Sequence, residues 1–285
     1  MLRNVLGIVG VSSLLFAASL TLASAADMPV KAPAVSAAYN WSGCYVGANA
    51  GFDFERFGDT LNTTGGVVAI PGIGLVPFAP GSTGLAQHGT SPAAGLQGGC
   101  RWESADHAVL GFEGDFDWTN LRGTSTVINV NPPFPCTTGI CNGDTVADRA
   151  QWQGSARLIF GRSFDRWLAY ATGGWALTRA TMTATFIPVI FNGVPFAGST
   201  GSDTKLMNGF IIGAGAAYRL SSNWEIGAEY RYTFYPQTAS SFNLGTGVPP
   251  CFVGIGGIGC ASTAATGNKS LDVNEVLVKL NYRFN

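Results

Sequence analysis

Apolar and polar residues alternate with period two in eight stretches of this chain. In the last stretch, the even-numbered positions from 276 to 284 are Val, Val, Leu, Tyr and Phe, and the positions between them are Leu, Lys, Asn and Arg. Successive side chains of a β-strand point to opposite faces, so each stretch predicts a strand with one apolar and one polar face. The predicted strands are residues 43–54, 93–103, 107–118, 151–162, 167–177, 206–220, 224–232 and 276–284.

The connections between these strands are alternately short and long. The short ones lie around residues 104–106, 163–166 and 221–223, and the long ones run about 55–92, 119–150, 178–205 and 233–270. Outer-membrane barrels have an even number of antiparallel strands, short periplasmic turns and longer extracellular loops. The pattern therefore predicts an all-β fold, namely an eight-stranded antiparallel transmembrane β-barrel with short periplasmic turns and four long extracellular loops.

Composition agrees with strands that face lipid. Charged residues make up 12% of the chain, about half of the soluble average of roughly 25%. A lipocalin-like barrel or a β-sandwich would also alternate, but it would turn its apolar face inward. Here the polar faces carry Arg, Glu, Asp, Gln and Gly, and Trp and Tyr lie at the margins of the apolar faces, which favours an apolar exterior. The net charge of −1 gives no indication of nucleic-acid binding.

The N-terminus indicates the compartment. Arg3 precedes an apolar segment, residues 5–22, and Ala23-Ser24-Ala25 follows as a small-residue cleavage site. We expect residues 1–25 to be a signal peptide, 26–40 a flexible periplasmic leader, and 41–285 the barrel domain. A retained N-terminal anchor is the alternative. The signal peptide and the barrel together predict that the protein is exported to the periplasm and inserted into the outer membrane of a Gram-negative bacterium.

Six cysteines in an exported chain predict disulfides. Cys136 and Cys141 enclose four residues, and Cys251 and Cys260 enclose eight, both within predicted loops, so local pairs are expected. A structural zinc site is the alternative, but there is no nearby His and no CxxC spacing.

The other two cysteines lie on predicted strands. Cys44 opens the first strand and Cys100 lies near the end of the second, and both fall at the periplasmic end on the outward face. Antiparallel neighbours can bring such residues side by side, which makes a cross-strand disulfide one interpretation. Two free thiols in lipid are the other.

The polar faces of the strands carry ionisable residues of both signs. An eight-stranded barrel is just wide enough for side chains to fill, and buried charges must be paired. We therefore expect a charge network that closes the lumen, although the many inward glycines leave a thin water path as an alternative. The residues assigned to this network are Asp53, Arg101, Glu103, Glu113, Asp115, Asp117, Arg157, Arg219, Glu225, Glu229, Arg231, Glu275, Lys279 and Arg283.

Several segments resemble a known family. They are ADMPVKAP (26–33), WSGCYVGANAG (41–51), YATGGWA (170–176), residues 209–220 and EYRY (229–232). These are similar to the small outer-membrane barrels of alphaproteobacteria, the major outer-membrane immunogenic proteins often labelled "porin family". The resemblance covers nearly the whole mature chain, and it specifies the family better than the function, because the motifs are strand and turn patterns.

The resemblance also implies partners. In this family the closing strand carries a signal for the barrel-assembly machinery that usually ends in an aromatic residue, which places the signal at Tyr282 and Phe284. Here Asn285 follows Phe284, a one-residue departure from that pattern. The further partners expected are outer-membrane lipid and lipopolysaccharide. Neither a cofactor nor a metal is expected, and the sequence does not indicate an oligomeric state.

Three functions fit these observations. The first is a structural barrel that contributes to envelope integrity and to surface interactions through its loops. The second is a narrow porin-like channel for small solutes, as the family label suggests. The third is binding of a surface ligand such as haem, or of a host partner, by apolar loop segments such as residues 67–78; His88 is the one His in a predicted long loop. Catalysis is not expected, because His88 and Ser91 would lie on opposite faces of a strand.

Overall fold

The computed structural model describes residues 39–63, 66–70, 74–78, 80–128, 136–137, 140–191, 194–196, 198–242, 251–254, 257–260 and 265–284. The predicted signal peptide and most of the predicted leader lie outside these residues, so those boundaries stay predictions. No helix in the described part of the chain is long and apolar enough to cross a membrane.

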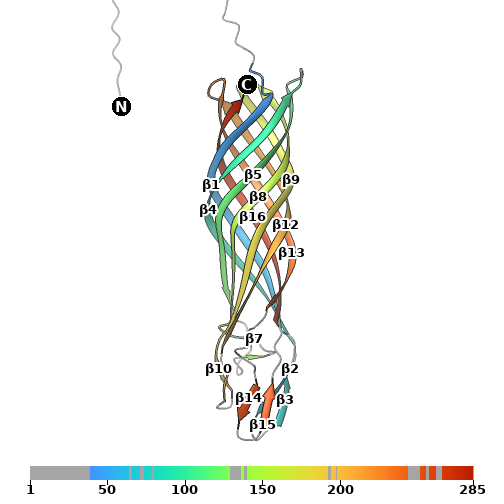
Figure 1. Cartoon of the computed structure of the whole chain (residues 1–285), viewed down its shortest axis with the longest axis vertical. Helices are drawn as coiled ribbons and strands as arrows, with labels where there is room; N and C mark the ends of the chain where they lie inside the picture. Colours follow the sequence, from blue (N-terminus) through green and yellow to red (C-terminus); the bar gives the residue numbers. More distant parts are fainter. Residues whose placement is uncertain are drawn as a thin grey trace, which may run out of the picture. The chain divides into compact units, whose positions relative to one another are not determined.

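Eight long antiparallel strands form a closed barrel, which confirms the predicted fold class (Figure 1). Each pairs with its sequence neighbours in the ring, and β1 closes the barrel by pairing with β16. The strands are β1 (Gly43–Thr63), β4 (Gly81–Glu103), β5 (Ala108–Thr126), β8 (Thr145–Phe164), β9 (Trp167–Phe186), β12 (Ser199–Arg219), β13 (Trp224–Phe242) and β16 (Ala265–Phe284).

Four small hairpins lie within the long connections, at the barrel end opposite the short turns (Figure 1). Because short turns face the periplasm in outer-membrane barrels, the hairpin end is the extracellular end. The hairpins pair β2 (Gly66–Ile70) with β3 (Gly74–Phe78), β6 (Cys136–Thr137) with β7 (Ile140–Cys141), β10 (Val189–Phe191) with β11 (Val194–Phe196), and β14 (Cys251–Gly254) with β15 (Gly257–Cys260).

The part of the wall next to the short turns has an apolar exterior. Phe52, Leu96 and Leu158 are each more than half exposed there. Trp102 and Trp167 lie outward at the periplasmic margin of this belt, and the other margin carries outward tryptophans on β5 and β9. An apolar belt between aromatic girdles is what a bilayer requires. We call this part the membrane half: residues 43–54, 92–103, 108–120, 151–164, 167–178, 206–219, 224–234 and 274–284.

The strands continue well past this belt, which corrects the predicted strand ends. β1 runs to Thr63, whereas the sequence predicted a loop from residue 55, and the other seven strands are extended in the same direction. The alternation persists with its polarity reversed, because Phe57 and Leu61 point inward while Arg56 is exposed. We call this part the outer half: residues 55–63, 81–91, 121–126, 145–150, 179–186, 199–205, 235–242 and 265–273.

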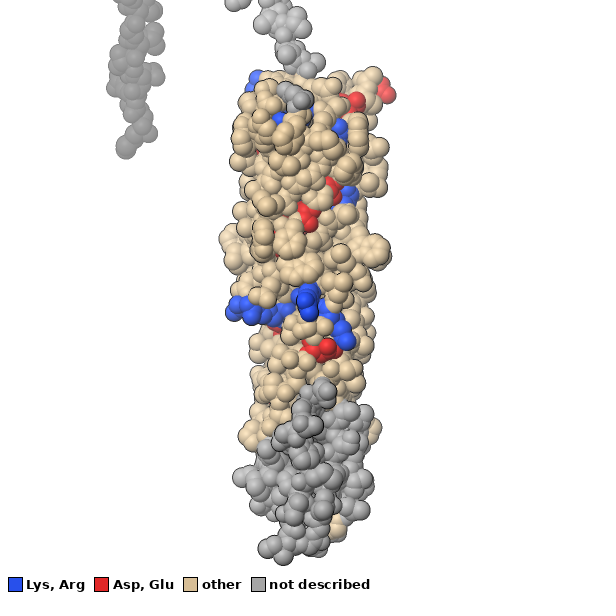
Figure 2. Space-filling model, in the orientation of Figure 1, with Lys and Arg blue, Asp and Glu red and all other residues tan. Residues whose placement is uncertain are grey.

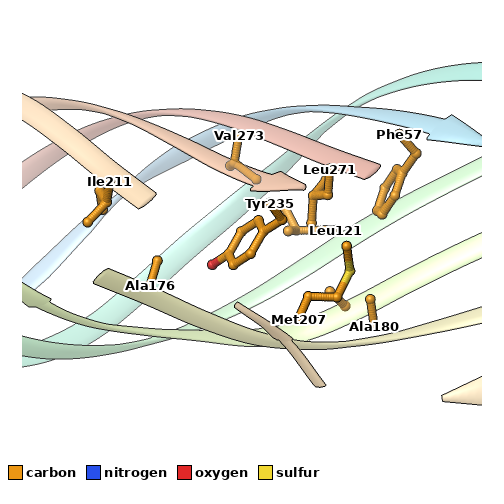
Figure 3. Close-up of a cluster of buried hydrophobic side chains, with 10 residues drawn as sticks. Phe57, Leu121, Ala176, Ala180, Met207, Ile211, Tyr235, Leu271 and Val273 are labelled. Atoms are coloured by element: carbon orange, nitrogen blue, oxygen red, sulfur yellow. The ribbon is translucent and has the colours of Figure 1, made fainter. Parts of the chain in front are cut away.

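The outer half encloses a hydrophobic core. Figure 3 shows Tyr235 of β13 directed among Leu121, Met207 and Leu271, which come from three other strands. A second cluster, which includes Leu61, Val146 and Met182, lies further toward the hairpins. Water surrounds this half, so burying apolar side chains inside it is favourable, as in a soluble protein.

Three register irregularities interrupt the wall near the boundary between the halves, and one of them lies in β5 between Trp118 and Leu121. In β8 the register shifts between Ala150 and Gln153, and Gln151, which the alternation placed inward, is exposed. In β13 the register shifts between Tyr235 and Thr238, around Pro236. Proline cannot donate to the ladder and is tolerated at such bulges.

Candidate functional site: the barrel lumen

Trp41 lies in the periplasmic mouth of the barrel. This side chain is fully buried, and its ring lies 4.9 Å from the guanidinium carbon of Arg219 and 5.3 Å from that of Arg101. Its backbone N–H donates to Glu103 Oε2 at 2.7 Å. A tryptophan at the periplasmic end of a strand would be expected in an exterior aromatic girdle, but Trp41 lies inside, because the chain enters the lumen before β1 begins at Gly43.

The two arginines nearest this mouth bind backbone carbonyls. Arg219 donates to the carbonyl of Asn40, and Arg283 donates to the same carbonyl at 3.0 Å and to the carbonyl of Ser42. Both arginines are buried in the lumen as predicted, but these contacts hold the segment before β1 instead of neutralising carboxylates. The alternation of apolar and polar residues does not reveal such partners.

Glu103 lies at the rim rather than deep in the lumen. It accepts hydrogen bonds from Ser163 Oγ and from the Trp41 backbone, and its Oε1 lies 3.2 Å from His107 Nδ1. Ser163 and Glu103 both approach Nδ1 of His107, whereas a catalytic triad uses both ring nitrogens, so the cluster does not have triad geometry.

Arg157 is the centre of the predicted charge network. It is buried and forms ion pairs with Glu113, Asp115 and Glu229. Lys279 joins two of the same carboxylates, with Nζ 2.6 Å from Glu113 and 2.9 Å from Glu229. The five side chains come from β5, β8, β13 and β16, so the ion pairs cross the lumen and join its opposite walls.

Arg231 extends this network toward the outer half. Its guanidinium donates to Asp117 Oδ2 at 3.0 Å and to Glu229 Oε1 at 2.7 Å, and lies 3.6 Å from Asp115. Asn49 donates to the other Asp117 oxygen at 2.7 Å. All these side chains are nearly inaccessible to solvent, so each charge depends on its partners for compensation.

A second ion pair lies between Trp41 and the central network. Arg101 pairs with Glu225, and both are buried. Asn281 Nδ2 donates to the same Glu225 oxygen at 2.9 Å, and its own oxygen accepts from Gln97 Nε2 at 2.7 Å. Polar side chains therefore continue across the barrel at this level.

The last two predicted network residues are bound by neutral partners. Asp53 accepts a hydrogen bond from Thr119 Oγ1 at 2.5 Å, and Glu275 accepts one from Gln153 Nε2 at 3.1 Å. Tyr235, from the hydrophobic core of the outer half, donates to Gln153 Oε1 at 3.1 Å. The polar lumen and the hydrophobic core therefore meet at this level, and both acids are buried.

The outer half contains buried charges that the sequence analysis missed. Gln87 Nε2 donates to Asp59 at 2.6 Å and to Asp148 at 3.2 Å, and Lys269 Nζ donates to the carbonyl of Ala180 at 2.7 Å. Burial, and then the charge of Asp148, raise the pKa of Asp59 to about 8. Burial also raises the pKa of Asp148 and lowers that of Lys269. The continued alternation was the signal that could have located these residues.

The lumenal glycines allow close packing of strands and side chains. A Cβ at Gly51 would lie 1.9 Å from the carbonyl oxygen of Val276, and one at Gly95 would lie 1.8 Å from Asp117 Oδ1. Either contact is far shorter than van der Waals distance. These positions let side chains and neighbouring strands approach closely.

A small cavity remains between the ion pairs and the mouth. Its volume is about 10 Å³, room for about one water molecule. Tyr45 and Tyr170 line it, and their hydroxyls donate to Glu113 at 2.5 Å and to Glu229 at 2.7 Å. The cavity is therefore a packing space within the network.

The cross-strand disulfide is present. Cys44 and Cys100 lie directly opposite each other in the β1–β4 register, with their Cα atoms 4.0 Å apart, and they are bonded. The outward parity of the two strands offered this pair as one of two interpretations, and the bond excludes the other, two free thiols.

The local cysteine pairs are described in part. Cys141 is disulfide-bonded, and Cys136 is its register partner in the β6–β7 hairpin. Cys251 lies opposite Cys260 in β14–β15. The side chains of Cys136, Cys251 and Cys260 lie outside the described residues, so both pairings stay predictions.

The predicted assembly signal lies on the exterior of the closing strand. Tyr282 and Phe284 face outward on β16, and their ring centroids are 5.6 Å apart. Trp224 of β13 contacts Tyr282 at 5.2 Å between centroids. Recognition of these rings by the assembly machinery stays a prediction.

Comparisons with known proteins agree with this architecture. Residues 13–284 match the family model described as "Outer membrane protein beta-barrel domain". The 31 kDa outer-membrane immunogenic proteins of Brucella melitensis biotype 1 and Brucella suis biovar 1 are 27% identical over 222 residues, which is 75% of this chain and 81% of theirs. A similar solved structure is OprG from Pseudomonas aeruginosa, with 10% identity, a TM-score of 0.42, and coverage of 87% of this chain and 98% of that one. The chain belongs to the outer-membrane protein β-barrel family, and its place is the Gram-negative outer membrane.

Proposed function

We propose that this protein is a closed, non-catalytic structural barrel that contributes to envelope integrity and presents its loops at the cell surface. The observation that carries the proposal is that three different groups of side chains occupy the lumen, one after another along the barrel. Trp41 fills the periplasmic mouth, the Arg157 and Arg231 network fills the membrane half, and the core around Tyr235 fills the outer half.

The series arrangement argues against the porin-like alternative. A solute that passed Trp41 would next meet ion pairs that join opposite walls, and then an apolar core. Opening the network would leave buried charges without partners, at a cost of about 3–5 kcal/mol for each broken pair. Opening the core would expose packed apolar side chains to water. Thermal fluctuation at one level therefore does not produce a continuous path.

Surface exposure of the loops supports the second part of the proposal. The Brucella relatives are named as immunogenic proteins, and we extend that surface role to this chain. The four hairpins lie at the outer end of the barrel, where host molecules have access to them. Haem binding gains no support from His88, because this exposed residue lies on the outer face of the barrel wall.

The absence of catalysis is also part of the proposal. Ser91 points into the lumen and donates to Glu55 at 2.8 Å, whereas His88 is exposed on the opposite face of β4. A base and a nucleophile must come within hydrogen-bond distance to act together. The one His–Ser pair that the sequence offered as a candidate therefore does not form a catalytic unit.

Conductance of the refolded, oxidised protein in a planar bilayer tests the proposal. Folding is first verified by heat-modifiable migration on a gel, and a porin of known conductance serves as the positive control. We expect no discrete steps from the wild-type protein. We also expect Trp41→Gly to stay silent, because two fillings remain behind the mouth. Reproducible steps from the folded wild type would contradict the closed lumen and favour the small-solute channel.

A further inference from the structure

Basic side chains on the outside of the barrel gather at one level. Figure 2 shows Lys and Arg side chains together across the wall, between the largely uncharged belt and the hairpin end. On the described strands, Arg56 of β1, Arg122 of β5, Arg149 of β8 and Arg179 of β9 are all exposed and face outward. We call these four residues the arginine arc.

The register brings members of the arc close together. Arg122 lies directly opposite Arg149 in the β5–β8 pair. Arg149 lies opposite Thr181 of β9, so Arg179 is its diagonal neighbour on the same face. Directly opposite residues have Cβ atoms about 4.5–5.5 Å apart and diagonal ones about 7–8 Å. One anion can therefore contact two guanidinium groups at once.

The β1 end of the arc has one neutral and one acidic neighbour. Arg56 pairs in register with His88 of β4 on one side and with Asp272 of β16 on the other. Asp272 accepts a hydrogen bond from Tyr232 at 3.1 Å and ends the basic surface there. The arc therefore covers one side of the barrel, from β1 through β9.

The protein does little to neutralise the positive charges of the arc. Within the described part of the chain, none of its four arginines takes part in an ion pair. Arg122 Nε donates at 2.8 Å to the neutral side chain of Asn120. Like charges directly opposite on a sheet are destabilising, so the Arg122–Arg149 pair calls for an external anion.

The position of the arc identifies that anion. Two of the arginines directly follow the last large outward apolar residue of the belt on their strands: Phe54 precedes Arg56, and Leu177 precedes Arg179, and both of these apolar side chains are exposed. The arc therefore lies where the hydrocarbon layer ends on the extracellular side. Lipid phosphate groups lie at that depth, and arginine binds phosphate through paired, charge-assisted hydrogen bonds.

We propose that the arginine arc is a binding surface for the phosphate groups of the phosphorylated glycolipid, lipopolysaccharide, that forms the outer leaflet. One phosphate lies between Arg122 and Arg149, and a second phosphate of the same headgroup, or of a neighbouring one, reaches Arg179 or Arg56. The surface fixes the depth of the barrel in the membrane and surrounds one side of it with bound lipid. This proposal does not depend on whether the lumen conducts.

The test compares binding of bisphosphorylated lipid A with binding of its dephosphorylated form. The refolded, oxidised protein is titrated in detergent, and bound lipid is counted by native mass spectrometry. The variant is Arg122→Ala with Arg149→Ala. The matched control is Arg162→Ala, which removes an exposed outward arginine of β8 at the periplasmic end. Because these side chains are exposed, all variants are expected to fold, and heat-modifiable migration verifies this.

We expect affinity for bisphosphorylated lipid A to fall about tenfold or more in the double variant, because it loses a charge-assisted contact with phosphate. The Arg162→Ala control should bind like the wild type, and the dephosphorylated lipid should bind all proteins equally weakly. Equal affinity of the double variant and the wild type would overturn the proposal. So would competition by millimolar inorganic phosphate that removes the lipid, because it would indicate a site for the free ion.

Discussion

In the membrane half the lumen holds ion pairs and the exterior is apolar, whereas in the outer half the lumen holds a hydrophobic core and the exterior is polar. Arg157 and Phe57 are both buried inside the same barrel, but their neighbours are carboxylates in one case and hydrocarbon side chains in the other. The same strands carry both patterns. The difference shows that the surrounding solvent selects which face of a strand is apolar.

Each half also has its own source of stability. In water, beyond the membrane, the outer half can use the hydrophobic effect as any soluble domain does. In lipid, moving an apolar side chain from the exterior to the lumen brings no such gain, so the membrane half depends on backbone pairing and on compensated polar contacts. Substitutions in the two halves should therefore have different effects on stability, and four experiments test this difference.

The largest expected effect is the loss of Arg157. Arg157→Ala leaves Glu113, Asp115 and Glu229 with one fewer cation, which should cost about 3–5 kcal/mol of unfolding free energy. Urea unfolding in lipid vesicles measures this. Arg157→Lys, which keeps the charge but cannot form the fork of hydrogen bonds, should lose less. A loss below that of exposed Arg162→Ala would contradict the pairing argument.

Truncating the outer core should act locally. Leu271→Ala removes a fully buried side chain, at a cost of about 2–5 kcal/mol. Hydrogen exchange should increase in the outer half while the membrane half keeps its protection. The control is Thr266→Ala on the polar exterior of the same strand. Uniform loss of protection along β16 would show that the halves are not separate energetic units.

Removing the cross-strand disulfide should affect the periplasmic end. Cys44→Ala with Cys100→Ala releases a loop constraint worth about 2–4 kcal/mol, but the β1–β4 ladder that surrounds the bond remains. Urea unfolding should shift modestly, and exchange should rise near Gly43. Increased exchange at the hairpin end instead would contradict the local role of this bond.

The last prediction is a pH dependence confined to the outer half. The folded pKa of Asp59 is about 8, and that of an unfolded Asp is about 3.9. Between these values the native state binds more protons, so the stability of the outer half should fall as the pH rises from about 4 to about 8. Asp59→Asn should flatten this dependence when exchange is measured across that range. An unchanged slope in the variant would assign the effect to another group.

The sequence predicted the membrane half better than the outer half. Lipid imposes a strict rule on exterior residues, so the alternation from Val276 to Phe284 was sufficient to assign β16 its inward and outward faces. Beyond the belt, Arg56 falls on the face that had been apolar, and the same alternation was interpreted as the beginning of a loop. Testing each predicted loop for alternation in the opposite phase would have found Phe57 and Leu61.

Contacts that depend on chain path were not predictable from the strand pattern. The charge network residues were assigned to the lumen by parity alone, and parity gave their location but not their partners. Arg219 and Arg283 bind carbonyls of the segment before β1, and Trp41 enters the lumen, because that segment folds into the mouth. Nothing in the alternation of β1 indicates where the preceding residues go.

Accessibility of single spin labels along the exterior of β16 tests the two-half account most directly. Labels at 268, 272, 276, 280 and 284 would be introduced one at a time into the oxidised protein in bilayers. The account predicts preferential access to oxygen, which dissolves in lipid, at 276 and 280, and to a water-soluble nickel reagent at 268 and 272. Preferential oxygen access at 268 and 272 would place the outer half in the membrane and contradict the account.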